Sequence, residues 1–163
     1  MALKARPILT LFCGLPGSGK TTVAKRIEAE CGSIRICTDD WQEALGVPHV
    51  DEDFHQRLQT QLYSLALELL RHGVHVILED GLWTQPERTQ KLTDARSLDA
   101  KTHLHFFDLD LRTLKDRVER RNAALPAGAV PINLDDLSHW HQAVFQRPDA
   151  LELALFDEVT IHR

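Results

Sequence analysis

The chain has 163 residues, a length that suits one domain with an ordinary hydrophobic core, so we expect residues 1–163 to form a single domain. Its composition, 43% hydrophobic and 26% charged, is typical of a soluble globular protein, and its longest apolar runs are strand-sized, which excludes a membrane-spanning segment. The formal net charge of −5 disfavours a nucleic-acid partner, although a local basic channel would be enough for one.

The first predicted element is a strand at Ile8–Cys13, an apolar run rich in strand-forming residues. A glycine-rich stretch, GLPGSGKTT, follows at Gly14–Thr22. A helix is then predicted over Thr22–Cys31, where apolar residues recur at every fourth position. The glycine-rich stretch therefore joins a strand to a helix, and it must need backbone conformations that other residues do not readily take.

This stretch matches the pattern G-x-x-x-x-G-K-[ST], with Gly14, Gly19, Lys20 and Thr21 at its fixed positions. The backbone N–H groups of such a loop form an anion-binding concavity, and the dipole of the following helix reinforces it. We expect Lys20 to reach the outer phosphates of a magnesium nucleoside triphosphate and Thr21 to ligate the metal. The expected nucleotide-binding residues are Gly14, Leu15, Pro16, Gly17, Ser18, Gly19, Lys20, Thr21 and Thr22.

The rest of the chain alternates between strand and helix patterns. Further strands are predicted at 33–38, 74–80, 102–109 and 156–163, and further helices at 52–71, from residue 82 onward, at 111–122 and at 134–145. Thr84 and Glu87 have the spacing of a capping box, with Pro86 in the first turn. This alternation predicts a three-layer α/β fold with a parallel five-stranded sheet, whose functional groups gather at the carboxyl ends of the strands.

Two acidic residues, Asp39 and Asp40, follow the second predicted strand and would lie beside the glycine-rich loop. Asp40 and Glu43 have capping-box spacing, so Asp40 is expected to cap a short helix that begins at Trp41. Asp39 is then free to face the nucleotide, where a carboxylate either binds magnesium or accepts the proton of an acceptor hydroxyl. The alternative is that both acids are turn residues.

A second acidic pair, Glu79 and Asp80, ends the third predicted strand, where an acid can stand close to the magnesium. Neighbouring strand residues point to opposite faces, so only one of the two can serve, and the sequence leaves the choice open. Gly81 would permit the close approach of a substrate. Trp83 would either form a wall of the acceptor pocket or pack in the core.

Three arginines, Arg117, Arg120 and Arg121, lie on one arc of the predicted helix at 111–122, which leads into an Ala/Pro/Gly-rich loop at 123–131. We interpret this loop as a mobile lid and place the lid region at residues 117–135. Arginines at its entrance would clamp phosphate, because a guanidinium binds phosphate oxygens in pairs. A solvated charged face is the alternative explanation for them.

The three cysteines are odd in number and lie in strand-like or helical contexts without metal-ligand spacing: Cys13, Cys31 and Cys37. The N-terminal segment, residues 1–7, lacks the long apolar stretch of a signal peptide. Together these observations predict reduced core thiols in a cytoplasmic protein.

Four segments together resemble a known group of P-loop kinases: GLPGSGKTT, TDDW, LEDGLWTQPER, and FFDLDLRTLKDRVERRN with the VP that follows it. The group contains the 5′-kinase domain of phage polynucleotide kinase, gluconate kinase, chloramphenicol phosphotransferase and zeta toxin. The chain looks most similar to small bacterial kinases of the AAA-domain ATP-binding type, over nearly its whole length. The resemblance implies a P-loop NTPase fold like that of nucleoside monophosphate kinases, with a short lid.

The polynucleotide kinase pattern R-D-D-Y carries the general base as its first aspartate, and Asp39 in the segment TDDW matches that position. That family also places an arginine shortly after the tyrosine to hold the substrate's phosphate. This chain has Gln42 and Glu43 in that region, a departure that disfavours a nucleic-acid acceptor.

The resemblance thus implies an ATP- and magnesium-dependent phosphotransferase that acts on a hydroxyl of a small-molecule acceptor. The alternatives are a polynucleotide 5′-hydroxyl kinase and a nucleotide-dependent switch that transfers no phosphate. The expected catalytic residues are Lys20, Asp39, Arg117, Arg120 and Arg121, and the expected metal-binding residues are Thr21, Asp39, Glu79 and Asp80. The identity of the acceptor, the choice between ATP and GTP, and the oligomeric state are left open by the sequence.

Overall fold

The computed structural model describes residues 5–126 and 129–163, so residues 1–4 of the N-terminal segment and residues 127–128 of the expected lid lie outside the described residues. One sheet of five parallel strands, in the order β2-β3-β1-β4-β5, forms the centre. The strands are β1 (Ile8–Cys13), β2 (Ile34–Ile36), β3 (Val76–Leu78), β4 (Lys101–Phe107) and β5 (Glu158–His162). The predicted α/β fold with a parallel five-stranded sheet is confirmed.

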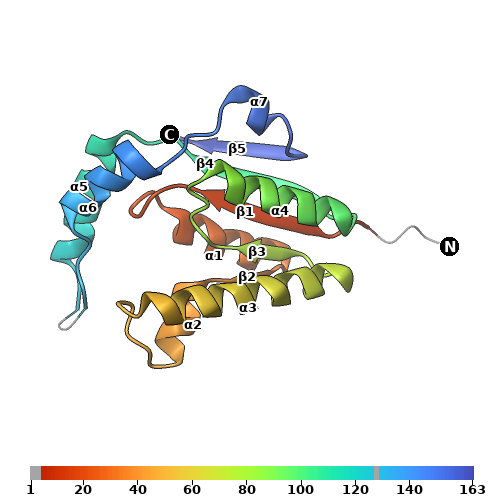
Figure 1. Ribbon diagram of the computed structural model, residues 1–163, viewed down its shortest axis with the longest axis horizontal. Coiled ribbons are helices and arrows are strands. Elements are labelled where there is room, and N and C mark those ends of the chain that lie inside the picture. The colour runs from red at the N-terminus through yellow and green to blue at the C-terminus, as the bar shows by residue number, and fades with distance from the viewer. Residues whose placement is uncertain (1–4, 127–128) are drawn as a thin grey trace.

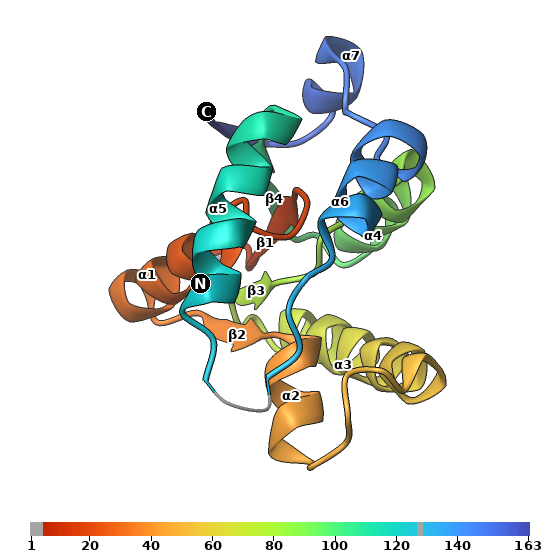
Figure 2. The same ribbon diagram turned by 90° about the vertical axis from the view of Figure 1, so that its left-hand side faces the viewer.

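Helices cover both faces of the sheet (Figure 1 and Figure 2). α1 (Lys20–Cys31) packs on one face, and α3 (Glu52–Arg71) and α4 (Gln85–Ser97) pack on the other. α5 (Leu111–Ala123) and α6 (Leu134–His139) lie beyond the carboxyl ends of the strands, at the left of Figure 1. The remaining described elements are α2 (Thr38–Ala44), the π-helical turn η1 (Trp140–Val144) and α7 (Ala150–Leu153).

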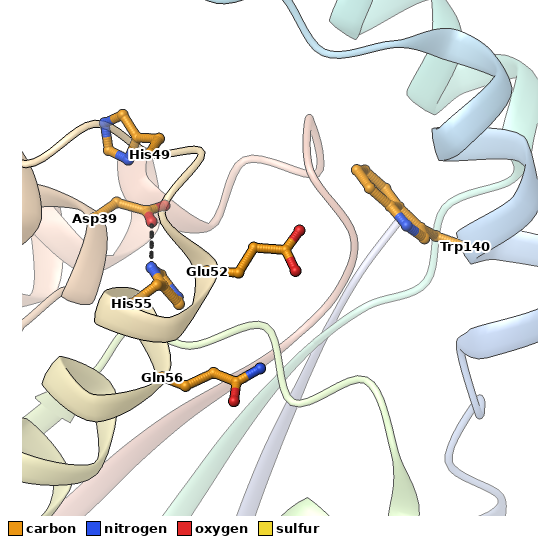
Figure 3. A pocket seen from close by; sticks show the side chains of 6 residues that line it. All are labelled: Asp39, His49, Glu52, His55, Gln56 and Trp140. Carbon is orange, nitrogen blue, oxygen red and sulfur yellow. Dashed lines mark ion pairs between the residues drawn. The ribbon is translucent and has the colours of Figure 1, made fainter.

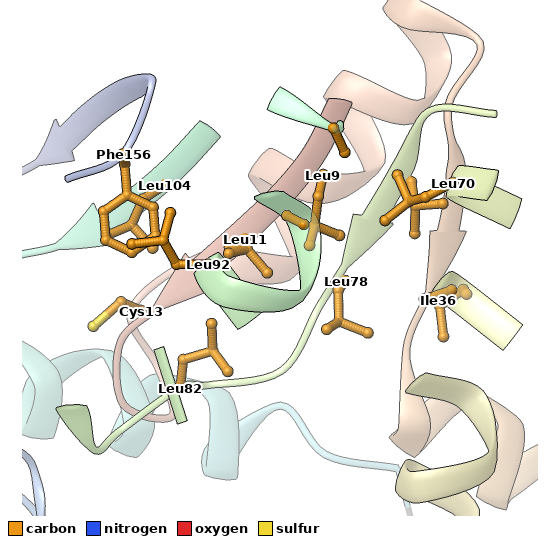
Figure 4. Packing of buried hydrophobic residues seen from close by; sticks show 14 of the residues in the cluster. Leu9, Leu11, Cys13, Ile36, Leu70, Leu78, Leu82, Leu92, Leu104 and Phe156 are labelled. Carbon is orange, nitrogen blue, oxygen red and sulfur yellow. The ribbon is translucent and has the colours of Figure 1, made fainter. Parts of the chain in front are cut away.

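Strand β1 is buried on both faces, and its alternating side chains belong to two separate hydrophobic clusters. Leu9, Leu11 and Cys13 lie in the large cluster on the α3 and α4 side of the sheet (Figure 4). Phe12 lies in the smaller cluster on the other side, against Ala24 of α1. Because both faces of β1 are packed, the point at which the chain leaves this strand is held firmly in place.

Most elements lie where the sequence predicts them. α3 spans the predicted range 52–71, and the capping box of Thr84 and Glu87 is present at the start of α4. The predicted helix at 134–145 is present over residues 134–144, but its second half, η1, is π-helical, and Phe145 N donates to Trp140 O (2.7 Å). The short helix α7 was not predicted.

The predicted helix cap at Asp40 is also wrong. α2 begins at Thr38, so Asp40 lies inside its first turn, and Cys37 is the residue that precedes the helix. The carboxylate of Asp40 instead accepts a hydrogen bond from Nη1 of Arg35 (2.7 Å). This ion pair ties the start of α2 to strand β2.

The three cysteines differ in exposure, although all of them are free thiols. Cys13 and Cys37 are buried, and burial raises the pKa of each thiol to about 12. Cys31 is exposed at the end of α1, so its predicted place in the core is wrong. No helix within residues 5–126 and 129–163 is long and apolar enough to cross a membrane.

A fully buried arginine, Arg88 of α4, joins three parts of the chain. Its Nε and Nη2 donate to the carboxylate of Glu152 on α7, with Nη2 3.0 Å from Oε2. Its Nη1 donates to Leu82 O (3.0 Å) and contacts Sγ of Cys13 (3.7 Å). Arg88 therefore holds α7 and the segment after β3 against the end of β1, just before the glycine-rich stretch begins.

The substitution Arg88→Met should destabilise the fold by about 3–5 kcal/mol, because it leaves the Glu152 carboxylate buried without its partner. Urea unfolding followed by circular dichroism measures this change. The double variant Arg88→Met/Glu152→Leu should recover most of the loss, since it buries no charge. A single variant as stable as the unmodified protein, or a double variant less stable than the single one, would contradict this account.

Candidate active site

The glycine-rich stretch forms a tight loop between β1 and α1. Gly17 and Gly19 have φ angles of 81° and 100°, values that favour glycine. A Cβ atom on Gly17 would lie 2.7 Å from Cγ2 of Val118 on α5, so this glycine also lets α5 approach the loop. The backbone conformations that the sequence predicts for this loop are present.

Lys20, the first residue of α1, turns its side chain back into the curve of this loop. Its Nζ donates to Gly14 O (3.0 Å) and Leu15 O (2.9 Å). Burial lowers the pKa of the ammonium to about 8, against the opposing attraction of the carboxylates of Glu79 and Asp39. The ammonium therefore lies inside the loop, with these two carboxylates as its acidic neighbours.

The structure separates the two acids that follow β3. Glu79 accepts a hydrogen bond from the Thr21 hydroxyl with Oε1 and pairs with Nε of Arg35 through Oε2. Asp80 accepts a hydrogen bond from the Thr38 hydroxyl (3.3 Å), and burial raises the pKa of its carboxyl. Glu79 is therefore the acid beside Thr21, and Asp80 faces the start of α2.

The side chains of Asp39 and Asp40 also have different surroundings. Asp40 is bonded to Arg35, whereas the side chain of Asp39 is 69% exposed and its Oδ1 lies 3.8 Å from Nδ1 of His55. Asp39 lines a pocket of about 420 Å³ (Figure 3). The other lining residues are His49, Glu52, His55, Gln56 and Trp140.

Trp83 packs inside the molecule and supports the loop. Its indole Nε1 donates to Gly14 O (3.2 Å), and its ring lies 5.3 Å from that of Trp140. A Cβ atom on Gly81 would lie 2.4 Å from Trp83 Nε1, so Gly81 makes room for this indole. Of the two interpretations left open for Trp83, packing is confirmed, and Trp140 is the tryptophan that lines the pocket.

The three arginines of α5 differ in their contacts. Nη1 of Arg117 donates to Ser18 O (3.1 Å). The charge of Arg121 adds to the lowering of the Lys20 pKa, for which burial is the largest cause. Arg120 makes no hydrogen bond or ion pair with any other residue that the structure describes. Among the three arginines of the predicted arc, Arg117 is therefore the member that bonds to the loop in the described part of the chain.

A second pocket, of about 360 Å³, lies on the other side of the loop. Apolar side chains of Phe107, Leu109 and Val23 line it together with Arg117. Its remaining lining residues are Ser18, Gly19, Thr22, His162 and Arg163. The phosphate-binding loop thus has one pocket on each side.

Most residues of the pocket around Asp39 carry no motif in the sequence. Glu52, His55 and Gln56 lie in the first turns of α3, where the only sequence signal is the start of an amphipathic helix. Trp140 directly follows α6 at the start of η1, and its sequence carries no signal that it lines a pocket with Asp39. Arg35 was also missed, since one arginine in a three-residue strand carries no motif.

A phosphate-binding loop after β1, a threonine bonded to the acid after β3, and a five-stranded parallel sheet together define a P-loop fold of the kinase type. The family model described as "AAA domain" matches residues 9–147, and the chain belongs to this family. The search of curated proteins returned no match.

Solved structures of P-loop kinases share this fold. A candidate kinase from Chloroflexus aurantiacus J-10-fl has a TM-score of 0.70 at 18% identity, covering 96% of this chain and 84% of that one. The APS kinase of Mycobacterium tuberculosis, in complex with AMPPNP and APS, has a TM-score of 0.64 at 20% identity, covering 96% and 88%. A chain of the Pnkp1/Rnl/Hen1 RNA repair complex has a TM-score of 0.69 at 20% identity, covering 85% and 44%. At these identities the likeness shows the fold alone.

The substitution Lys20→Ala should weaken the binding of ATP by about ten- to a hundredfold while leaving the fold intact, because the ammonium serves the loop and not the core. Isothermal titration calorimetry with ATP and magnesium measures the affinity. Lys25→Ala removes an exposed lysine from the same helix and should bind ATP normally. Equal affinities for the two variants would remove Lys20 from the nucleotide site.

Proposed function

We propose that this protein transfers the γ-phosphate of ATP to a hydroxyl group of a small-molecule acceptor. The position of Asp39 carries the proposal. Its carboxylate lines the 420 Å³ pocket and lies close enough to Lys20 to act on the pKa of that ammonium. A base between a phosphate-binding loop and an open pocket is the arrangement that phosphoryl transfer to a hydroxyl requires.

The nucleotide would occupy the loop and the pocket of 360 Å³ beside it. The loop N–H groups and Lys20 would hold the phosphates. The apolar surfaces of Phe107, Leu109 and Val23 offer a slot for the flat base, with the Arg117 guanidinium beside it. The APS kinase structure holds AMPPNP and APS together, so this fold accommodates a nucleotide and a small molecule at once.

The donor set beside Lys20 fits magnesium. Thr21 and Glu79 present a hydroxyl and a carboxylate side by side, both hard oxygen ligands. The described residues hold no cluster of three or more metal-binding side chains, which suits a cation that takes most of its ligands from phosphates and water. Magnesium, when bound, would neutralise charge on the β- and γ-phosphates.

The chemical step follows from these positions. Asp39 takes the proton from the acceptor hydroxyl as the hydroxyl oxygen forms its bond to the γ-phosphorus. The bond between that phosphorus and the β–γ bridging oxygen breaks, and ADP leaves with the bonding electron pair. Lys20 and Arg121 stabilise the charge that spreads over the transferring group. The exposed Asp39 then releases its proton to solvent.

A polynucleotide acceptor is the weaker candidate. The charged side chains that line the pocket, within the described part of the chain, are the carboxylates of Asp39 and Glu52 together with the imidazoles of two histidines. Two carboxylates repel a phosphodiester backbone. The neighbour from the RNA repair complex shows a shared fold and leaves this argument unchanged.

The substitution Asp39→Asn should lower the rate of phosphoryl transfer by about 10²–10⁴-fold with ATP affinity nearly preserved, because asparagine keeps the shape but accepts no proton. Asp40→Asn should lower the rate far less, since Asp40 is engaged with Arg35. Transfer from radiolabelled ATP to a panel of hydroxyl compounds measures both. If both variants bind ATP and transfer phosphate normally, Asp39 is no base and a nucleotide-dependent switch becomes the better account.

Among the arginines, Arg121→Ala should lower kcat by about 10²-fold with little change in the KM for ATP, because charge stabilisation grows in the transition state. Arg120→Ala is the matched control on the same helix and should retain near-normal kcat. Steady-state kinetics at saturating ATP compares them. Normal turnover by all single variants, Arg117→Ala included, would reduce the arginine arc to a solvated face.

A further inference from the structure

The acceptor pocket has two unlike walls, and both are visible in Figure 3. On one side the first turns of α2 and α3 contribute Asp39, Glu52 and His55. On the other side η1 contributes Trp140, and Glu52 extends into the space in front of this ring. Its volume of about 420 Å³ falls in the range of roughly 300–1,000 Å³ that small-molecule sites occupy.

The charge of this pocket is negative. Asp39 and Glu52 bring two carboxylates, and none of the lining side chains described is a lysine or an arginine. Glu52 forms no ion pair with any residue in the described ranges. An anionic acceptor would therefore meet repulsion here.

Two cations on the neighbouring elements are engaged with other groups. Arg35 is bonded to both Asp40 and Glu79. The ammonium of Lys91 lies 3.3 Å from the centre of the Tyr63 ring. Neither side chain lines the pocket, and the charge of Lys20, which acts on Asp39, lies in the phosphate-binding loop.

The histidine at the pocket wall adds a further acceptor of hydrogen bonds. Nε2 of the buried Gln42 donates to Pro48 O (2.8 Å), so its Oε1 is the atom that meets Nδ1 of His55 (2.8 Å). Because Oε1 accepts only, Nδ1 of His55 carries the proton. When the ring is uncharged, its lone pair lies on Nε2, so this nitrogen accepts a hydrogen bond and does not donate one.

The other wall of the pocket carries the aromatic ring of Trp140. Its ring is half-buried and held against Trp83, with ring centres 5.3 Å apart. An indole face attracts a cation through its ring quadrupole. A carboxylate that faces an indole therefore makes a site for an ammonium group.

We propose that the phosphate acceptor is a small hydroxyl compound that carries a cationic amine, such as an amino alcohol or an amino sugar. Glu52 and Trp140 hold the ammonium, and Asp39 takes the proton of the hydroxyl. The hydroxyl oxygen becomes the phosphate-ester oxygen and the amine keeps all its bonds. This inference rests on the proposed function and narrows its substrate class.

A simpler explanation for an acid at position 52 is that its charge stabilises the N-terminus of α3. Asp53 lies in the same first turn, is exposed and does not line the pocket. A charge that acts only on the helix would have similar effects at both positions. Comparison of Glu52→Gln with Asp53→Asn therefore separates substrate binding from helix stabilisation.

The experiment uses acceptors in matched sets that differ in one substituent. One set is 6-amino-6-deoxyglucose, glucose and glucuronate, and the other is 3-aminopropane-1,2-diol, glycerol and glycerate. Phosphate transfer from radiolabelled ATP is measured for each compound at neutral pH. Thermal stabilisation of the protein with magnesium and ADP by each compound gives a second readout that needs no turnover.

The amine of each set should give the highest kcat/KM and the largest thermal shift. Glu52→Gln should raise KM for the amine by about ten- to a hundredfold with kcat nearly unchanged. Trp140→Phe should raise the KM for the amine by about two- to fivefold. Asp53→Asn should leave both the KM for the amine and kcat unchanged.

Transfer to a neutral or anionic compound at the expense of the amine overturns the inference while the proposed function stands. Amine binding that Glu52→Gln abolishes, without transfer to any compound, supports an ammonium site at Glu52 but overturns both the proposed function and the amine's role as phosphate acceptor. Absence of both binding and transfer for the amines, or equal effects of Glu52→Gln and Asp53→Asn, also overturns the inference.

Discussion

The site depends on how the main chain of Gly14 is held at the end of β1. Gly14 N donates to Gly81 O (3.0 Å), which joins the ends of the neighbouring strands β1 and β3. The Gly14 carbonyl accepts hydrogen bonds from Lys20 Nζ (3.0 Å) and from the indole of Trp83 (3.2 Å). Both glycines are needed, since a Cβ on Gly14 would lie 2.9 Å from Cβ of Phe107 and one on Gly81 would meet Trp83. The start of the phosphate-binding loop is therefore set by the sheet.

A series of hydrogen bonds and ion pairs gives the acidic residues around this loop different roles. Thr21 is bonded to Glu79, Glu79 to Arg35, and Arg35 to Asp40. The carboxylates of Glu79 and Asp40 are therefore both paired with Arg35. Asp80 differs from them, because burial raises the pKa of its carboxyl. Asp39 alone among the two predicted acidic pairs lines the open pocket. Environment, and not residue type, assigns these carboxylates their tasks.

The two pockets differ in the chemistry of their walls. The pocket beside Phe107 is walled by apolar groups and an arginine, whereas the pocket around Asp39 has carboxylates and a tryptophan. α5 contributes Arg117 to the first of these pockets, and the same side chain bonds to Ser18 O of the loop. Asn122, at the end of α5, bonds twice to the main chain of Ile132 (2.8 and 3.0 Å), which closes the base of the segment that was interpreted as a lid. Mobility of that segment stays a prediction.

By itself, the sequence determined the order of strands and helices, the parallel sheet and the phosphate-binding loop, because these follow from local periodicity and from a motif with fixed spacing. It also indicated Lys20, Thr21 and Asp39 as candidate active-site residues. It misplaced the start of α2, since the spacing of Asp40 and Glu43 imitates a capping box while Arg35, five residues earlier, takes the Asp40 carboxylate.

Only the tertiary structure decided which acid faces Thr21, which tryptophan lines the pocket and which arginines meet the loop. Each of these depends on residues far apart in the chain: Thr21 meets Glu79 across 58 positions, and Arg117 meets Ser18 across 99. Trp140 and Glu52 line one pocket although they lie on elements far apart in the chain, η1 and α3. Local patterns specify elements, but the contacts between their ends arise only when the sheet brings the carboxyl ends of its strands together.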